Sequence, residues 1–204
     1  MLGAWRHPVL MVGTDPLEVD RLMLGGLLRC PGCEERLRPW GWARMRDVRE
    51  LSEVIVVRPR RSLCSGCAGA HVLLPELFLA RRADTAAVIG AALTAKATGA
   101  GHRSIAVMLD RPVGTVRAWL RRFAGRVESI RVLFTGLLFL LDPEADGPRP
   151  AGSLFADAVE VVGLAAAAAV RMFGPRSVWQ FASAASSGLL LGPVTTAGLA
   201  GNTS

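Results

Sequence analysis

Residues 30–33 read Cys-Pro-Gly-Cys and residues 64–67 read Cys-Ser-Gly-Cys, and these four cysteines are the only ones in the chain. Two cysteines separated by a short turn that contains glycine can direct both sulfurs toward one ion. Two such pairs supply the four thiolates of a tetrahedral zinc site. We therefore predict that Cys30, Cys33, Cys64 and Cys67 bind a structural Zn2+ ion, and that the segment between the pairs forms a hairpin that brings them together.

Three other interpretations of the cysteines remain open, namely a redox dithiol, two structural disulfides and four unrelated core residues. A redox motif is typical of a strand-to-helix junction, whereas strand-like sequence rich in arginine flanks these pairs. Disulfides are typical of exported proteins, and we expect no export signal because Asp15, Pro16 and Glu18 interrupt the short apolar run near the N-terminus. His71 follows Cys67 closely and is a candidate spare ligand, although an ordinary histidine beside the ribbon is the simpler interpretation.

Positive charge is concentrated in the first part of the chain. The net charge is +7, and residues 1–141 hold 21 basic and 12 acidic side chains, against 3 basic and 5 acidic in residues 142–204. Such a surface indicates a polyanionic partner such as nucleic acid. No run reaches the roughly 20 apolar residues that cross a bilayer. We therefore expect a cytoplasmic, nucleoid-associated protein without a membrane partner.

A second informative stretch covers residues 102–123. Residues 102–109 and 113–123 have helical periodicity and flank a short turn, which is the pattern of a helix-turn-helix. Asp110 stands in the turn at a position where glycine is common, and Asp tolerates the left-handed conformation better than most residues. One face of the second helix is apolar and can pack on the first helix; it carries Val113, Val116, Trp119, Leu120 and Phe123.

The opposite face of this helix predicts contacts with double-stranded DNA. We expect Arg117 and Arg121 to contact base edges, with the small Ala118 allowing a close approach to the major groove. The residues expected to contact phosphates are Arg103, Arg111, Thr115 and Arg122. The alternative is an ordinary helical hairpin whose basic face is only solvated.

These motifs predict a mainly α fold with a small β zinc ribbon, a helix-turn-helix bundle and a C-terminal helical tail. The expected divisions are an N-terminal helical segment (1–29, with a helix from Asp15-Pro16 to about Leu28), a zinc ribbon (30–75, with strands at 38–46 and 53–61), a helix-turn-helix domain (76–141, with helical sequence from about Glu76), a linker (142–152) and a C-terminal helical region (153–204). Because one helix-turn-helix binds DNA weakly, we expect a homodimer. The Ala-rich segment 158–170 is the candidate dimer contact.

Several stretches also resemble a known family. They are residues 38–41 (Arg-Pro-Trp-Gly), 71–75 (His-Val-Leu-Leu-Pro), 81–84 (Arg-Arg-Ala-Asp), 88–90, 101–103 and 115–123. In this order they resemble a family of small actinobacterial proteins of unknown function, over about residues 20–141. Members of that family look like the N-terminal part of insertion-sequence transposases, a zinc ribbon followed by a helix-turn-helix. The resemblance implies DNA binding and descent from mobile elements, and it implies no known reaction.

The sequence favours a binding protein over an enzyme. It has neither a nucleophile elbow nor a phosphate-binding loop, its three histidines have no evident partners, and the acids after Phe123 do not fit the metal-binding carboxylates of a transposase core. We identify no small-molecule substrate. The expected function is therefore sequence-specific DNA binding, as a transcriptional regulator or a domesticated transposase fragment. The alternatives are a zinc-ribbon module that docks on another protein, and a thiol redox sensor.

Overall fold

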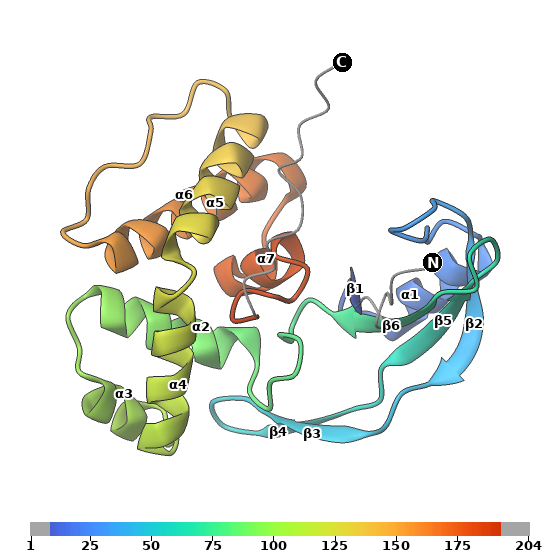
Figure 1. Cartoon of the computed structure of the whole chain (residues 1–204), viewed down its shortest axis with the longest axis horizontal. Coiled ribbons are helices and arrows are strands. Elements are labelled where there is room, and N and C mark those ends of the chain that lie inside the picture. The colour runs from blue at the N-terminus through green and yellow to red at the C-terminus, as the bar shows by residue number, and fades with distance from the viewer. Residues whose placement is uncertain (1–8, 193–204) are drawn as a thin grey trace, which may run out of the picture.

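The computed structural model describes residues 9–192 and places a β-sheet part beside a helical part (Figure 1). Residues 1–8 of the predicted N-terminal segment and residues 193–204 of the predicted C-terminal region lie outside the described residues. The architecture is mixed α/β, with an N-terminal β-sheet that carries four clustered cysteines and with most of the helices after it. Across residues 9–192, no helix combines the length and the apolar character needed to cross a bilayer.

The strands form two sheets. The larger sheet has the order β1-β6-β5-β2, in which β1 is parallel to β6 and the other neighbours are antiparallel. The smaller sheet is the antiparallel β3–β4 hairpin. The strands are β1 (Val9–Val12), β2 (Leu37–Trp42), β3 (Arg46–Arg49), β4 (Val54–Val57), β5 (Arg60–Cys64) and β6 (Ala70–Pro75).

The predicted ribbon hairpin is present, but each of its two strands is divided. The predicted strand 38–46 becomes β2 and β3, and the predicted strand 53–61 becomes β4 and the start of β5. Gly41 has φ of +85° where the β2–β5 register shifts, which bends the first strand. Pro59 has no N–H to donate, which interrupts the second strand between β4 and β5. The prediction of two continuous strands, 38–46 and 53–61, was therefore wrong at these two bends.

Helix α1 (Pro16–Leu24) covers one face of the larger sheet. Its start is as predicted, because the side chain of Asp15 accepts a hydrogen bond from the backbone N–H of Leu17 at 2.9 Å. It ends four residues before the predicted Leu28, because Gly25 caps it and the next glycine has φ of +68°. Val19 and Met23 are buried against Leu73 of β6, which fixes the helix on the sheet.

The helical part has a single hydrophobic core to which all six of its helices contribute. Phe123 and Phe134 are its largest fully buried side chains, and burying each contributes roughly 1.5–3 kcal/mol. The helices predicted for residues 76–141 and 153–204 therefore pack together. They are α2 (Ala86–Ala97), α3 (His102–Met108), α4 (Val113–Ala124), α5 (Val127–Leu141), α6 (Leu154–Phe173) and α7 (Val178–Ala185), and residues 142–152 between α5 and α6 have neither helix nor strand.

The predicted start of helical structure near Glu76 is wrong. Residues 76–85 form turns, and α2 begins after Thr85, whose hydroxyl caps Val88 N at 3.3 Å. The backbone of this connection is used in tertiary hydrogen bonds instead: Ala86 N donates to Leu77 O at 2.9 Å, and Arg49 N donates to Ala83 O at 2.9 Å. In residues 76–85, backbone hydrogen bonds to other parts of the chain, including β3 of the hairpin, thus replace the helix that the local sequence favours.

The end of the described chain is bonded to the same connection. Ser183 Oγ of α7 donates to Phe78 O at 2.7 Å, and Arg82 Nη2 donates to Leu191 O at 2.7 Å. Between them, Ala80 N donates to Gly188 O at 2.9 Å. The segment that joins the sheet to the helices is therefore closed by residues more than a hundred positions later.

Helix α6 is internal to the chain. Ala158, Val162, Ala165, Ala166 and Ala169 are fully buried in the helical core, and α6 lies along α5 (Figure 1). The predicted dimer contact at 158–170 is therefore wrong, because this small-residue face already packs inside the monomer. The homodimer itself stays a prediction, and it would have to use another surface.

Candidate metal centre and nucleic-acid interface

The four cysteines meet at one end of the larger sheet. Cys64 ends β5 and Cys67 lies in the turn before β6, whereas Cys30 and Cys33 lie in the loop between α1 and β2. All four Sγ atoms lie within 4.8 Å of one another. Cys30 Sγ is 3.7 Å from Cys67 Sγ, and Cys33 Sγ is 3.3 Å from Cys64 Sγ. The hairpin thus brings the two predicted pairs together.

These distances suit a shared metal ion. Four sulfurs about 2.3 Å from one zinc ion lie about 3.8 Å apart in a regular tetrahedron. The two S–S contacts of 3.7 and 3.3 Å are near this value. They are far longer than the bond of about 2.05 Å in a disulfide, and all four cysteines are free thiols. The cluster could therefore hold a metal ion with small side-chain shifts.

The two cysteine turns have the same local geometry. Gly32 N donates to Cys30 Sγ at 3.4 Å, and Gly66 N donates to Cys64 Sγ at 3.4 Å. The residue after each pair lies in the left-handed region, with φ of +60° and +56°. Backbone N–H groups that point at sulfur stabilise the thiolate form, which is the form that binds metal. Each turn therefore orients its sulfurs and favours their charge.

Negative charge is unequally shared between the two sulfurs closest to each other. Burial opposes the thiolate of Cys64, but the N–H groups of Cys67 and Gly66 and the thiol of Cys33 stabilise it, which lowers the pKa of Cys64 to about 6. The N–H of Glu35 favours the thiolate of Cys33, but the sulfurs of Cys64, Cys67 and Cys30 together with burial outweigh it and raise the pKa of Cys33 to about 12. Adjacent thiolates repel each other, and a divalent cation removes that repulsion.

His71 touches the cluster from β6. It is 2% exposed, and its Nε2 lies 3.4 Å from Cys30 Sγ. A protonated Nε2 can donate to this sulfur, which is the usual task of a group that supports a metal ligand without binding the metal itself. The structure thus brings His71 to the cluster, and the four sulfurs form the ligand set without it.

The second candidate site is the pair α3–α4, joined by a tight turn. Ile105, Val116, Trp119 and Phe123 are buried between α2, α3 and α4, as the apolar pattern predicted. Asp110 has φ of +51°, which confirms the left-handed turn. Val113 was expected on the buried face, but it is 42% exposed because α4 begins with it, beyond the edge of the core.

The opposite face of α4 is basic and accessible. The predicted residues Arg103, Arg117, Arg121 and Arg122 are exposed, whereas Thr115 and Ala118 are half-buried. Arg117 and Arg121 line a shallow hollow of about 330 Å³ together with His102 of α3 and Lys96 of α2. His102 and Lys96 were not among the predicted DNA-contacting residues. Lys96 could have been noticed, because it is the only lysine of the chain and directly follows the apolar residues of the predicted helix.

Arg82 adds positive charge on this side of the molecule. Burial, and to a smaller extent the positive charge of Arg122, lower the pKa of Arg82. At helical spacing, Thr115, Ala118 and Arg122 follow one line along α4, while Arg117 and Arg121 follow the next. The two lines make one continuous surface of cationic and small side chains.

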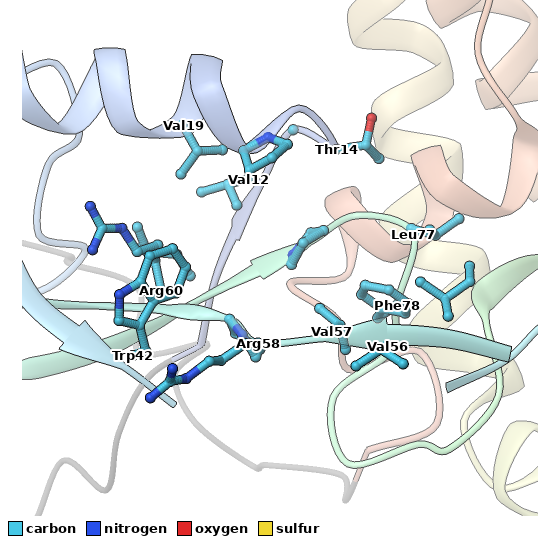
Figure 2. Close-up of a pocket in the computed structure, with 16 residues that line it drawn as sticks. Val12, Thr14, Val19, Trp42, Val56, Val57, Arg58, Arg60, Leu77 and Phe78 are labelled. Atoms are coloured by element: carbon cyan, nitrogen blue, oxygen red, sulfur yellow. The ribbon is translucent and has the colours of Figure 1, made fainter. Parts of the chain in front are cut away.

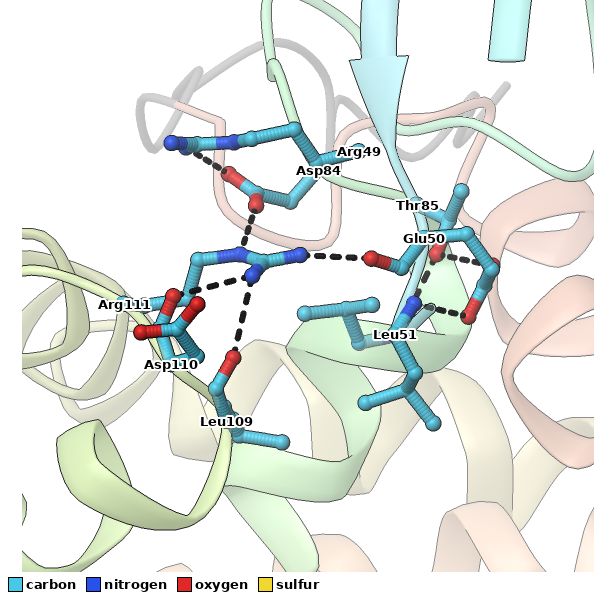
Figure 3. Close-up of polar contacts among 9 residues, drawn as sticks. Arg49, Glu50, Leu51, Asp84, Thr85, Leu109, Asp110 and Arg111 are labelled. Carbon is cyan, nitrogen blue, oxygen red and sulfur yellow. Dashed lines mark hydrogen bonds and ion pairs between the residues drawn. The ribbon is translucent and has the colours of Figure 1, made fainter. Parts of the chain in front are cut away.

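Arg111 does not belong to this surface. Its side chain is 7% exposed and makes a set of internal bonds (Figure 3). Nε donates to Asp84 Oδ1 at 2.6 Å, Nη2 donates to Glu50 O at 2.6 Å, and Nη1 donates to Leu109 O at 3.0 Å and Asp110 O at 2.9 Å. The expected phosphate contact is therefore wrong, because every nitrogen of this guanidinium already has a partner.

The Arg111 network links the hairpin to the turn between α3 and α4. Asp84 is 3% exposed and also accepts from Arg49 Nη2 of β3 at 2.7 Å. Thr85, the cap of α2, donates through Oγ1 to Glu50 Oε2 at 2.6 Å. One buried carboxylate thus joins β3, the start of α2 and the turn between α3 and α4.

Comparisons of the chain with protein-family models, with curated proteins and with solved structures found no match. The resemblance to the actinobacterial family stays a prediction. Two sites of the molecule bear on its function, namely the cysteine cluster and the basic face of α4.

Proposed function

We propose that this chain binds double-stranded DNA in a sequence-specific manner and uses α3–α4 as a helix-turn-helix. The observation that carries the proposal is the division of α4 into two faces. Val116, Trp119 and Phe123 are buried, whereas Arg117 and Arg121 are exposed on the opposite side. A helix held in this way can enter the major groove, where arginine binds guanine O6 and N7.

The residues around α4 suit phosphate contacts. Arg103, Thr115 and Arg122 flank the face of Arg117 and Arg121, and Lys96 adds positive charge at its edge. Ala118 lies between the arginines, so the backbone of α4 can approach the bases closely. Phosphate contacts at the edges would set the position of the helix, and the central arginines would set the sequence.

We propose Zn2+ as the ion of the cysteine cluster. An all-thiolate tetrahedral set is typical of zinc, and the S–S contacts of 3.3 and 3.7 Å are near the expected edge length. The ion would serve structure: with four thiolates bound, it offers no open position for a substrate. It would fix the end of the hairpin that carries the cysteines. At the other end of the hairpin, the backbone of Glu50 bonds Arg111 in the α3–α4 turn.

The experiment is a selection from genomic fragments with zinc-loaded full-length chain. The double variant Arg117→Ala, Arg121→Ala is compared with Arg149→Ala, Arg176→Ala, which removes the same charge from exposed positions away from α4. We expect a short motif with the parent and the control, and its loss with the α4 variant. A palindromic motif would also support a homodimer.

Salt dependence separates DNA binding from protein docking. Each phosphate contact adds about 0.9 to the slope of log affinity against log salt, so Arg103→Ala should lower the slope by about 1. No enrichment by the parent at low salt would refute the proposal and favour a zinc-ribbon module that docks on proteins. Enrichment by the parent and the α4 variant alike would refute the role of α4.

A further inference from the structure

A second hollow is lined by none of the four cysteines and by no residue of α4. It has a volume of about 280 Å³ and lies between α1, the β4–β5 segment and the loop after β6 (Figure 2). Its walls are mainly aliphatic and aromatic, from Val12 and Val19 on one side to Leu77 and Phe78 on the other. This volume is near the lower end of the range of about 300–1,000 Å³ for ligand pockets.

One end of the hollow is cationic. Figure 2 shows Trp42, Arg58 and Arg60 together at this end. The guanidinium carbon of Arg60 lies 4.2 Å from the centre of the Trp42 ring, and its Nε donates to Asp20 Oδ1 at 2.7 Å. These two contacts hold the Arg60 side chain in place, and its Nη groups make no hydrogen bond to residues 9–192.

The balance of charge favours an anion. None of the described residues that line the hollow is a carboxylate, and Asp20, which pairs with Arg60, lies outside the lining. Arg58 is exposed and carries no ion pair within residues 9–192. With Arg60 neutralised by Asp20, Arg58 leaves a net positive charge at the entrance. A carboxylate there could accept hydrogen bonds from Arg58 and from the Nη groups of Arg60.

The apolar end favours a carbocyclic ring. Among the described residues that line the hollow, Thr14 and the indole N–H of Trp42 are the only neutral polar side-chain groups. A nucleobase would bury ring nitrogens and oxygens among valine, proline and phenylalanine side chains, and polar atoms without partners are costly to bury. A ring without polar atoms, of the size of naphthalene, avoids that cost and can contact the Trp42 indole.

We propose that this hollow binds a small aromatic carboxylate, with the ring toward Phe78 and the carboxylate at Arg58 and Arg60. This site does not depend on DNA binding, because none of the residues that line the hollow belongs to α3 or α4. It gives the chain a site for a small anionic effector.

The same sheet offers a matched control. Trp40 is 47% exposed, Trp42 is 44% exposed, and Arg61 lies 4.2 Å from the Trp40 ring as Arg60 does from Trp42. Arg60 pairs with Leu73 and Arg61 with Val72, so the two pairs lie on opposite faces of the sheet. Only the pair of Trp42 lines the hollow.

The test is calorimetric titration of the zinc-loaded full-length chain with 1-naphthaleneacetate. We expect one saturable site per chain with a dissociation constant on the order of 1 mM or below. Trp42→Ala should abolish binding, and Arg58→Ala should weaken it by about tenfold, as expected for one charge-assisted hydrogen bond. Trp40→Ala should bind like the parent, and the neutral 1-naphthaleneacetamide should bind more weakly.

Three results would overturn the proposal. They are the absence of saturable binding, equal effects of Trp40→Ala and Trp42→Ala, and equal affinity for the acid and its amide. Adenosine monophosphate serves as a further arm, and tighter binding of this nucleotide would also overturn the choice of a carbocyclic ligand. Because Arg58 is exposed, its variant tests the site even if Trp42→Ala does not fold.

Discussion

Replacement of Arg111 by alanine should reduce the free energy of unfolding by about 3–4 kcal/mol. The side chain is 7% exposed and bonds one buried carboxylate and three carbonyl groups. Removing one partner of a buried ion pair costs about 3–5 kcal/mol. We expect the lower part of this range, because Asp84 keeps Arg49 at 2.7 Å.

Chemical denaturation followed by circular dichroism measures this change. In a chain of this size, 1 kcal/mol shifts the melting temperature by about 2–4 °C, so the expected shift is about 6–16 °C. Arg111→Lys should recover part of the loss, because an ammonium keeps the charge but cannot reach all four acceptors. Arg117→Ala should change stability by no more than about 0.5 kcal/mol, as exposed substitutions usually do.

Parent-like stability of Arg111→Ala, or equally strong destabilisation by Arg117→Ala, would contradict this prediction. Either result would mean that the Arg111 network does not hold the α3–α4 turn. If Arg111→Ala instead keeps its stability and loses DNA binding, Arg111 would contact a phosphate although its side chain is buried in this structure.

Three further predictions concern the metal and the packing of the helices. A chelator, or Cys64→Ser, should release one zinc per chain and lower stability, measured by metal analysis and thermal unfolding, while Ser65→Ala should leave the metal bound. Zinc affinity should fall as the pH falls, because the ion binds thiolates and protons compete with it for the sulfurs; a competition titration that shows no trend with pH would contradict binding by the four cysteines. Gly90→Ala should destabilise the chain, because its Cβ would lie 2.0–2.2 Å from Trp179 ring atoms, whereas Gly136→Ala has no atom within 4 Å and should stabilise α5 by about 0.5–1 kcal/mol; equal effects in thermal unfolding would contradict this packing.

The features that the sequence predicted correctly are those that depend on short-range patterns. The spacing of the cysteines, the Asp15 cap and the two faces of α4 each depend on neighbours within a few residues, and each is present in the structure. The bend at Gly41 was not predicted, because it depends on the register with a strand about twenty residues later.

Long-range contacts explain the remaining errors. Strand β1 is only four residues long and is recognisable through its parallel pairing with β6. Arg111 follows a helix in the sequence like any surface arginine, and only the folded chain places Asp84 and Glu50 beside it. For α6, a small-residue face predicts close packing, and sequence does not say whether the partner is another chain or α5.

The bonds from residues 183–191 to the connection at residues 78–82 also bear on how the chain is made. A ribosome releases the sheet and the connection before Ser183 and Leu191, so the carbonyl of Phe78 and the guanidinium of Arg82 cannot form these bonds until the later residues have emerged. Contacts of such wide sequence separation slow folding. During synthesis, the joint between the sheet and the helices should therefore become protected from proteases only after residues 183–191 have been made.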